Sequence, residues 1–188
     1  APSPPARRTT AAATRSETDM AKFALRYALA FIVLLPAQGV VFNHMTLFSV
    51  AVPLVFLWLL VSVPVTVGTN LTMLLGFLTG LGVDIFCDTP GVNALSCTVV
   101  SFAHKPLFHL YSSFDDDLGG RSPSSASMGA PAFVKFLLTT VALYCVLMFT
   151  IEAFQMFNFR MWILRVTSST IYTFIMLYAA DCLRPRRE

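Results

Sequence analysis

The chain has 188 residues, of which 56% are hydrophobic and 12% are charged, and its formal net charge is +3. An average soluble domain carries about 25% charged residues, so a mean hydropathy of +0.70 argues against a soluble domain. A membrane β-barrel does not fit either. Its strands alternate in hydrophobicity over about 10 residues, whereas the apolar blocks here are continuous. We therefore predict an all-α integral membrane protein.

The first 19 residues are rich in proline, alanine, threonine and arginine, and this composition predicts a disordered tail. Met20 stands where an inner-membrane protein commonly begins, so one interpretation is that residues 1–19 precede the native start. A cleaved signal peptide is the alternative, since Ala37-Gln38-Gly39 resembles a cleavage site. We favour a membrane span, because the apolar run resumes at Val40.

Six apolar blocks follow, each close to the roughly 20 residues that a bilayer-spanning helix needs. We predict residues 20–184 to form one membrane domain, with a cytoplasmic loop near residues 112–131 and a basic tail at residues 185–188. The six predicted transmembrane helices are Phe23–Asn43, Leu47–Val67, Asn70–Phe86, Val92–Leu110, Pro131–Phe154 and Trp162–Cys182.

Lysine and arginine residues near the ends of the spans predict the orientation, because they are enriched on the cytoplasmic side. Three regions carry them and would share one side: Lys22 and Arg26, Arg121 and Lys135, and the arginines of the C-terminal tail. We expect both termini to be cytoplasmic, although Arg160 and Arg165 weaken the bias. The positive charge is explained by anionic lipid, without nucleic acid.

The stretch "GLGVDIFCDTPG" places two carboxylates at the end of the third predicted helix. Gly76 and Gly80 form a small-xxx-small step that lets a neighbouring helix approach closely. Asp84 and Asp88 continue that face, and a carboxylate in hydrocarbon should face the bundle interior. Pro90 and Gly91 then stop the helix. We predict a helix-packing or partner-contact site made of Gly76, Gly80, Asp84, Asp88, Pro90 and Gly91; for Asp88 alone, a cap of the next helix is the simpler interpretation.

Catalysis has little support in the sequence. Intramembrane aspartyl proteases use a GxGD step, but Gly80 to Asp84 reads GxGxD, and the other acids within spans are Glu152 and Asp181. Cys87 and Cys97 show no metal-ligand spacing, so we expect free thiols, no metal and no cofactor. We predict no enzymatic activity.

Two further sets of polar residues lie near the ends of predicted helices. Glu152 could form an ion pair with Arg160 or Arg165, because a short connection brings those helix ends together. His104 and Lys105 are expected to reach the membrane interface from the inner end of the fourth helix.

Three stretches in order resemble the MreD family of bacterial rod shape-determining membrane proteins. "GFLTGLGVDIFCDTPGVNALSCTVVSFAHKPLFHLY" is similar to the family's central signature, in which a glycine-rich third helix ends in a D-x-x-x-D-T-x-G turn. "LPAQGVVFNHMTLFSVAVPLVFLWLL" resembles its first turn, and "FTIEAFQMFNF" its fifth helix. The likeness covers roughly Ala21 to Arg184; a histidine expected upstream of Glu152 is absent, and the aspartate- and serine-rich loop is longer than usual.

The resemblance implies a non-enzymatic scaffold of the cell-elongation machinery (the elongasome) in the inner membrane. The expected partners are membrane lipid and MreC and, through MreC, MreB, RodA and a class B penicillin-binding protein that makes side-wall peptidoglycan and maintains cell shape. It also implies a fold similar to the substrate-binding subunits of energy-coupling-factor transporters. That similarity supplies the alternative function, a membrane subunit that binds a vitamin or another small molecule for uptake.

Overall fold

A computed structural model describes residues 23–38, 54–89, 91–112, 123–153 and 159–183. Within these ranges every regular element is a helix. Three helices are long and apolar enough to cross a membrane, namely α3 (Thr69–Cys87), α6 (Ala130–Ala153) and α7 (Phe159–Cys182), and the apolar helix Phe23–Ala37 is shorter. The predicted disordered tail (residues 1–19) and basic tail (residues 185–188) lie outside the described residues.

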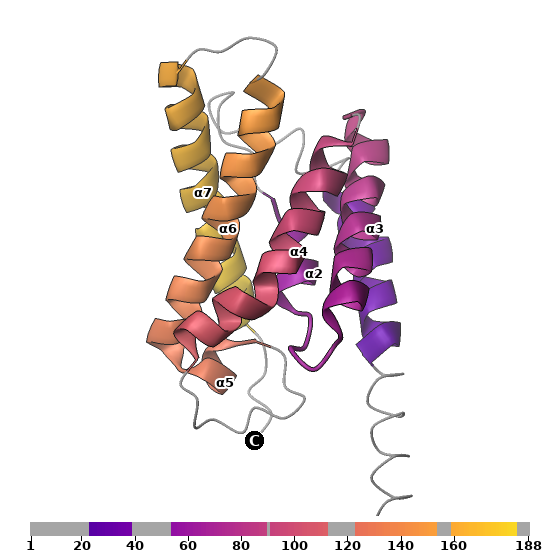
Figure 1. Ribbon diagram of the computed structural model, residues 1–188, viewed down its shortest axis with the longest axis vertical. Coiled ribbons are helices and arrows are strands. Elements are labelled where there is room, and N and C mark those ends of the chain that lie inside the picture. The colour runs from indigo at the N-terminus through magenta and orange to yellow at the C-terminus, as the bar shows by residue number, and fades with distance from the viewer. Residues whose placement is uncertain (1–22, 39–53, 90, 113–122, 154–158, 184–188) are drawn as a thin grey trace, which may run out of the picture.

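The helices form a bundle in which α4 (Val92–Tyr111) lies between α3 and α6 (Figure 1). The helix Phe23–Ala37 packs on α3 from the far side, where the hydroxyl groups of Tyr27 and Thr79 are 2.8 Å apart and hydrogen-bonded. At the opposite edge α7 packs on α6 (Figure 1). This order places α4 at the centre, where it presents Asn93, Ser96, Ser101 and His104 to the protein interior.

The third, fourth, fifth and sixth predicted spans are helices in the structure, with ends within a few residues of the prediction. The helix α7 begins at Phe159, three residues before the predicted start at Trp162. The predicted loop contains a further short helix, α5 (Ser125–Met128), which the sequence did not predict.

The second predicted span, Leu47–Val67, is wrong as a continuous helix. Of its described part only α2 (Leu57–Val61) is helical, and the chain from Ser62 to Gly68 is irregular. Pro64 explains the interruption, because it lacks an N–H group and disfavours helical backbone at the residue before it. Residues 47–53 lie outside the described residues.

The segment from Leu54 to Val63 is nevertheless largely buried in the bundle, which explains its high hydrophobicity. Leu54, Phe56 and Val63 are at most 2% exposed. Irregular backbone is tolerated at membrane depth when protein groups satisfy its hydrogen bonds. The N–H of Leu54 donates to Oγ1 of Thr173 at 3.1 Å, and the N–H of Val55 donates to Oε1 of Gln38 at 3.0 Å.

The outward surfaces of the helices are apolar. On α3 the exposed side chains include Leu74, Leu78 and Ile85, and on the first helix they include Leu29 and Ile32. A soluble protein rarely exposes such continuous apolar faces. With the three long apolar helices, they are compatible with a protein that crosses the membrane more than once.

Candidate functional site

The contact between α3 and α4 depends on two glycines. The buried face of α3 consists of Thr72, Gly76, Thr79, Gly80, Val83 and Asp84, which recur at helical spacing. A Cβ atom added to Gly80 would lie 2.5 Å from the Cα of Ala94, closer than real Cβ contacts. A Cβ at Gly76 would lie 2.9 Å from the backbone oxygen of Cys97. The missing side chains therefore let the two backbones come into contact at two positions one turn apart.

Asp84 lies one turn after Gly80 and uses that close approach to cap the N-terminus of α4. Its Oδ1 accepts the N–H of Asn93 at 3.0 Å, and its Oδ2 accepts the N–H of Ala94 at 2.9 Å. The first N–H groups of any helix lack partners within the helix, and the N-cap of α4, Gly91, has no side chain to supply one. Asp84 thus does from the preceding helix what a local cap residue normally does.

Two more hydrogen bonds complete the surroundings of the Asp84 carboxylate. Its Oδ1 also accepts the Thr89 hydroxyl at 2.7 Å and the side-chain amide of Asn93 at 2.9 Å. That amide reaches the Thr89 hydroxyl as well, at 2.9 Å. The four donors converge on a carboxylate that is only 6% exposed.

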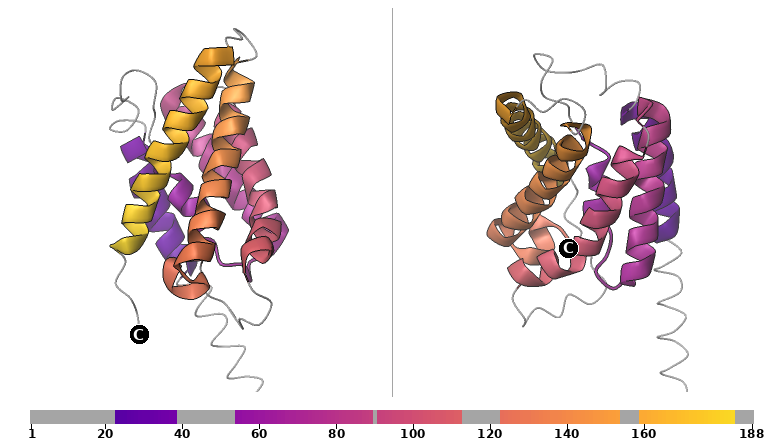
Figure 2. Two further views of the ribbon diagram at one scale, coloured as in Figure 1. Left: turned by 90° about the vertical axis from the view of Figure 1, so that its left-hand side faces the viewer. Right: turned by 45° about the horizontal axis from the view of Figure 1, so that its top comes forward.

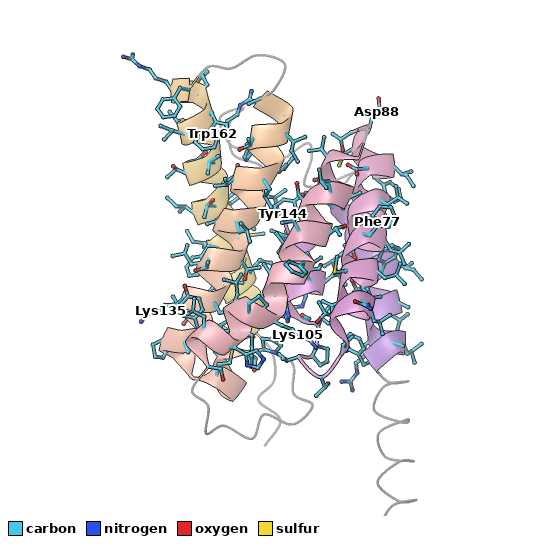
Figure 3. All side chains as sticks on the ribbon, viewed as in Figure 1. Phe77, Asp88, Lys105, Lys135, Tyr144 and Trp162 are labelled. Carbon is cyan, nitrogen blue, oxygen red and sulfur yellow. The ribbon has the colours of Figure 1, made fainter. Side chains whose placement is uncertain are left out.

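The network extends across α4 to α6 through Asn93. The hydroxyl of Tyr144 donates a hydrogen bond to Oδ1 of Asn93, and Tyr144 is fully buried against Phe56 in an edge-to-face contact. Tyr144 projects from α6 toward α4 at mid-height of the bundle (Figure 3). One chain of hydrogen bonds therefore joins α3, α4 and α6, and we call Asp84, Thr89, Asn93 and Tyr144 the Asp84 network.

The electrostatics explain how an acid is accommodated here. A buried charge is costly unless it is paired or hydrogen-bonded, and every described hydrogen bond to Asp84 comes from a neutral donor. The helix N-terminus carries a partial positive charge of roughly +0.5, which favours a carboxylate. Both oxygens of Asp84 are occupied, so the arrangement suits a structural joint better than proton transfer.

Asp88 does not continue the Asp84 face, and it does not cap α4. It is the C-cap residue of α3 with a left-handed backbone (φ 54°, ψ 41°), and its side chain is exposed. The left-handed turn directs the chain away from the α3 axis, which explains the failure of the helical spacing. Gly91 is the N-cap of α4 with φ 77°, a conformation that favours glycine. Pro90 lies outside the described residues.

The other candidate acids have separate partners. Glu152 and Arg165 form the predicted ion pair, with 3.5 Å between Oε1 and Nη1, on the exposed surface of α6 and α7. Asp181 accepts the N–H of Ser125 at 3.0 Å. The four cysteines are free thiols, and no group of three metal-ligating side chains occurs among the residues that the structure describes.

His104 differs from the expectation of an interface residue. It is 2% exposed, and its ring packs edge-to-face on Phe136. Its position on the inner face of α4 explains the burial. Lys105, the next residue, is partly exposed at the end of the bundle opposite Asp88 (Figure 3).

Sequence reasoning identified Gly76, Gly80 and Asp84 but missed the partners of Asp84. Asn93 follows Gly91 by two residues, at a first-turn position whose N–H always needs an acceptor. The position of Asn93 two residues after Gly91 therefore indicated that its N–H group would need an acceptor. Tyr144 had no signal of this kind, because a tyrosine within an apolar helix is more often a packing residue.

Replacing Gly80 by alanine tests the close approach. In a helix interior, alanine is normally more stabilising than glycine by about 1 kcal/mol. At this position, however, the added Cβ would push the backbone of α4 away. Overpacking costs about 1–3 kcal/mol, and we expect a lower melting temperature in detergent, measured by size-exclusion chromatography after heating. Gly68→Ala is the control, since its Cβ meets nothing within 4 Å. An unchanged melting temperature for Gly80→Ala would contradict the close approach.

Comparisons of the chain with protein-family models, curated proteins and solved structures find no match.

Proposed function

We propose that the chain is a non-enzymatic membrane scaffold of the bacterial cell-elongation machinery, similar to the MreD family. In this proposal it partners MreC and, through MreC, MreB, RodA and a class B penicillin-binding protein. The six membrane crossings and the likeness to substrate-binding subunits of energy-coupling-factor transporters belong to the same proposal.

The observation that carries the proposal is the use of Asp84 as a structural residue. The D-x-x-x-D-T-x-G signature, on which the resemblance to MreD rests, contains Asp84 and Thr89, and both are hydrogen-bonded within the α3–α4 junction. General acid–base catalysis needs a group within reach of a reacting atom, whereas the Asp84 oxygens are taken by donors of the protein itself. This supports a scaffold in which the motif keeps the helices rigidly paired.

The positions of the charges support the proposed orientation in the inner membrane. Lys105 and Lys135 lie at one end of the bundle, and Asp88 and Trp162 lie at the other (Figure 3). The end with the lysines would face the cytoplasm, where basic residues are enriched, and Arg160 and Arg165 at the other end weaken this bias without reversing it. Both chain termini would then be cytoplasmic.

Labelling with a membrane-impermeant maleimide tests this orientation. In a background with the four native cysteines replaced by serine, Asp88→Cys should be labelled in intact spheroplasts, because its side chain is exposed at the outer end. Ser125→Cys, at the start of α5, should be labelled only after permeabilisation. Labelling of Ser125→Cys in intact spheroplasts contradicts the orientation.

Co-purification tests the function itself. The tagged protein is extracted from its native membranes in mild detergent, and the proteins bound to it are identified by mass spectrometry. We expect MreC together with a class B penicillin-binding protein. Gly80→Ala should recover less of both, because it opens the α3–α4 contact, while Gly68→Ala should recover as much as the unmodified protein. Recovery of transporter ATPase subunits in place of MreC would support the uptake alternative and overturn the proposal.

A further inference from the structure

The helix α7 is the least enclosed of the long apolar helices. Only 17% of its most apolar 18-residue stretch is buried inside the protein, compared with 33% for α3 and 44% for α6. Figure 2 shows it crossing α6 on the outside of the bundle, away from α3. Its inward side chains include three hydroxyl residues, Ser169, Thr170 and Thr173. Its attachment therefore depends less on apolar packing than that of α6.

Three of the polar contacts made by α7 lie at three different depths. Near its start Arg165 pairs with Glu152 of α6, at its middle Oγ1 of Thr173 accepts the N–H of Leu54, and near its end Asp181 accepts the N–H of Ser125. The Arg165 pair is about half exposed, and exposed ion pairs contribute little. Of these three contacts, those of Thr173 and Asp181 are therefore expected to contribute more than the Arg165 pair.

Buried polar atoms without a hydrogen bond are concentrated on the same helix. Four such atoms occur among the described residues, and three are on α7: Nε1 of Trp162, Oγ1 of Thr170 and Oδ1 of Asp181. The thiol of Cys145 lies near the Thr170 hydroxyl. A thiol is only a weak hydrogen-bond partner. An unsatisfied buried polar group is costly and calls for an explanation. Here the three lie at three depths along one helix.

We propose that α7 can separate from the bundle and that the hydrogen bonds of Thr173 and Asp181, which we call its latches, hold it in place. In the second arrangement, the unsatisfied polar groups of α7 find hydrogen-bond partners. The physical basis is that apolar surfaces gain little by leaving lipid for protein, so a few hydrogen bonds decide whether a membrane helix stays docked. The release opens the interface between α6 and α7. This conformational change goes beyond the scaffold role and does not depend on it.

Cys145 reports on the release because it is a fully buried thiol of α6 that faces Thr170 of α7. Variants that retain only this cysteine are purified in detergent, and their labelling by N-ethylmaleimide is timed. Thr173→Val removes the hydroxyl with almost no change of shape, and we expect labelling to become roughly three to ten times faster. Thr173→Ser keeps the hydroxyl and should label at the original rate.

Two controls separate release from general unfolding. Thr167→Val makes the same chemical change at an exposed site on α7 and should not alter the rate. In matching variants that retain only Cys97, a fully buried thiol of α4, the rate should stay unchanged when Thr173 is replaced by valine. Faster labelling of Cys145 alone supports the proposal. No change, or equal acceleration at Cys97, overturns it.

Asp181→Leu provides a second variant that does not depend on Thr173. It removes the acceptor of the Ser125 N–H, whereas Asp181→Asn keeps an oxygen that can accept it. We expect faster labelling of Cys145 for Asp181→Leu than for Asp181→Asn, with Cys97 still protected. Equal rates for the two variants would contradict the role of Asp181 as a latch.

Discussion

The hydrogen bonds from the start of α4 to the Asp84 carboxylate are the interaction on which the rest of the bundle depends. They direct the first turn of α4 toward α3, and the absence of side chains at Gly76 and Gly80 lets the helices come that close. Glycine and aspartate act together, since an acid one turn beyond a bulkier residue could not reach the N–H groups. Asn93 then transmits the position of α4 to Tyr144 of α6.

The same principle recurs elsewhere in the bundle. Thr173 and Gln38 accept N–H groups of the irregular segment before α2, and Asp181 accepts the first N–H of α5. In water the hydrophobic effect would dominate such a fold. In lipid it contributes little between helices, so side chains that accept backbone N–H groups determine where each segment lies. That requirement explains why Gln38, Asp84, Thr173 and Asp181 are buried in this apolar chain.

The sequence predicted the helices whose pattern is local and missed what depends on tertiary contacts. Continuous hydrophobicity located α3, α6 and α7, and the GxxxG step with Asp84 located the α3–α4 contact. The same hydrophobicity led to the wrong prediction of a continuous helix at Leu47–Val67, because a buried irregular segment is as apolar as a transmembrane helix. Pro64 argued against a continuous helix there. The prediction that Asp88 continues the face of Asp84 was wrong, because helical spacing does not continue through a left-handed residue. The partnership of Asn93 with Tyr144, 51 residues apart, has no local signal.

Hydrogen exchange at the first turn of α4 tests the central claim most directly. The N–H groups of Asn93 and Ala94 would exchange quickly at an uncapped helix end, but the account predicts that they are as protected as the helix interior. Asp84→Leu should remove that protection, while Asp84→Asn, which keeps one accepting oxygen, should retain part of it. Fast exchange of both amides in the unmodified, folded protein, or equal protection in Asp84→Leu, would contradict the account.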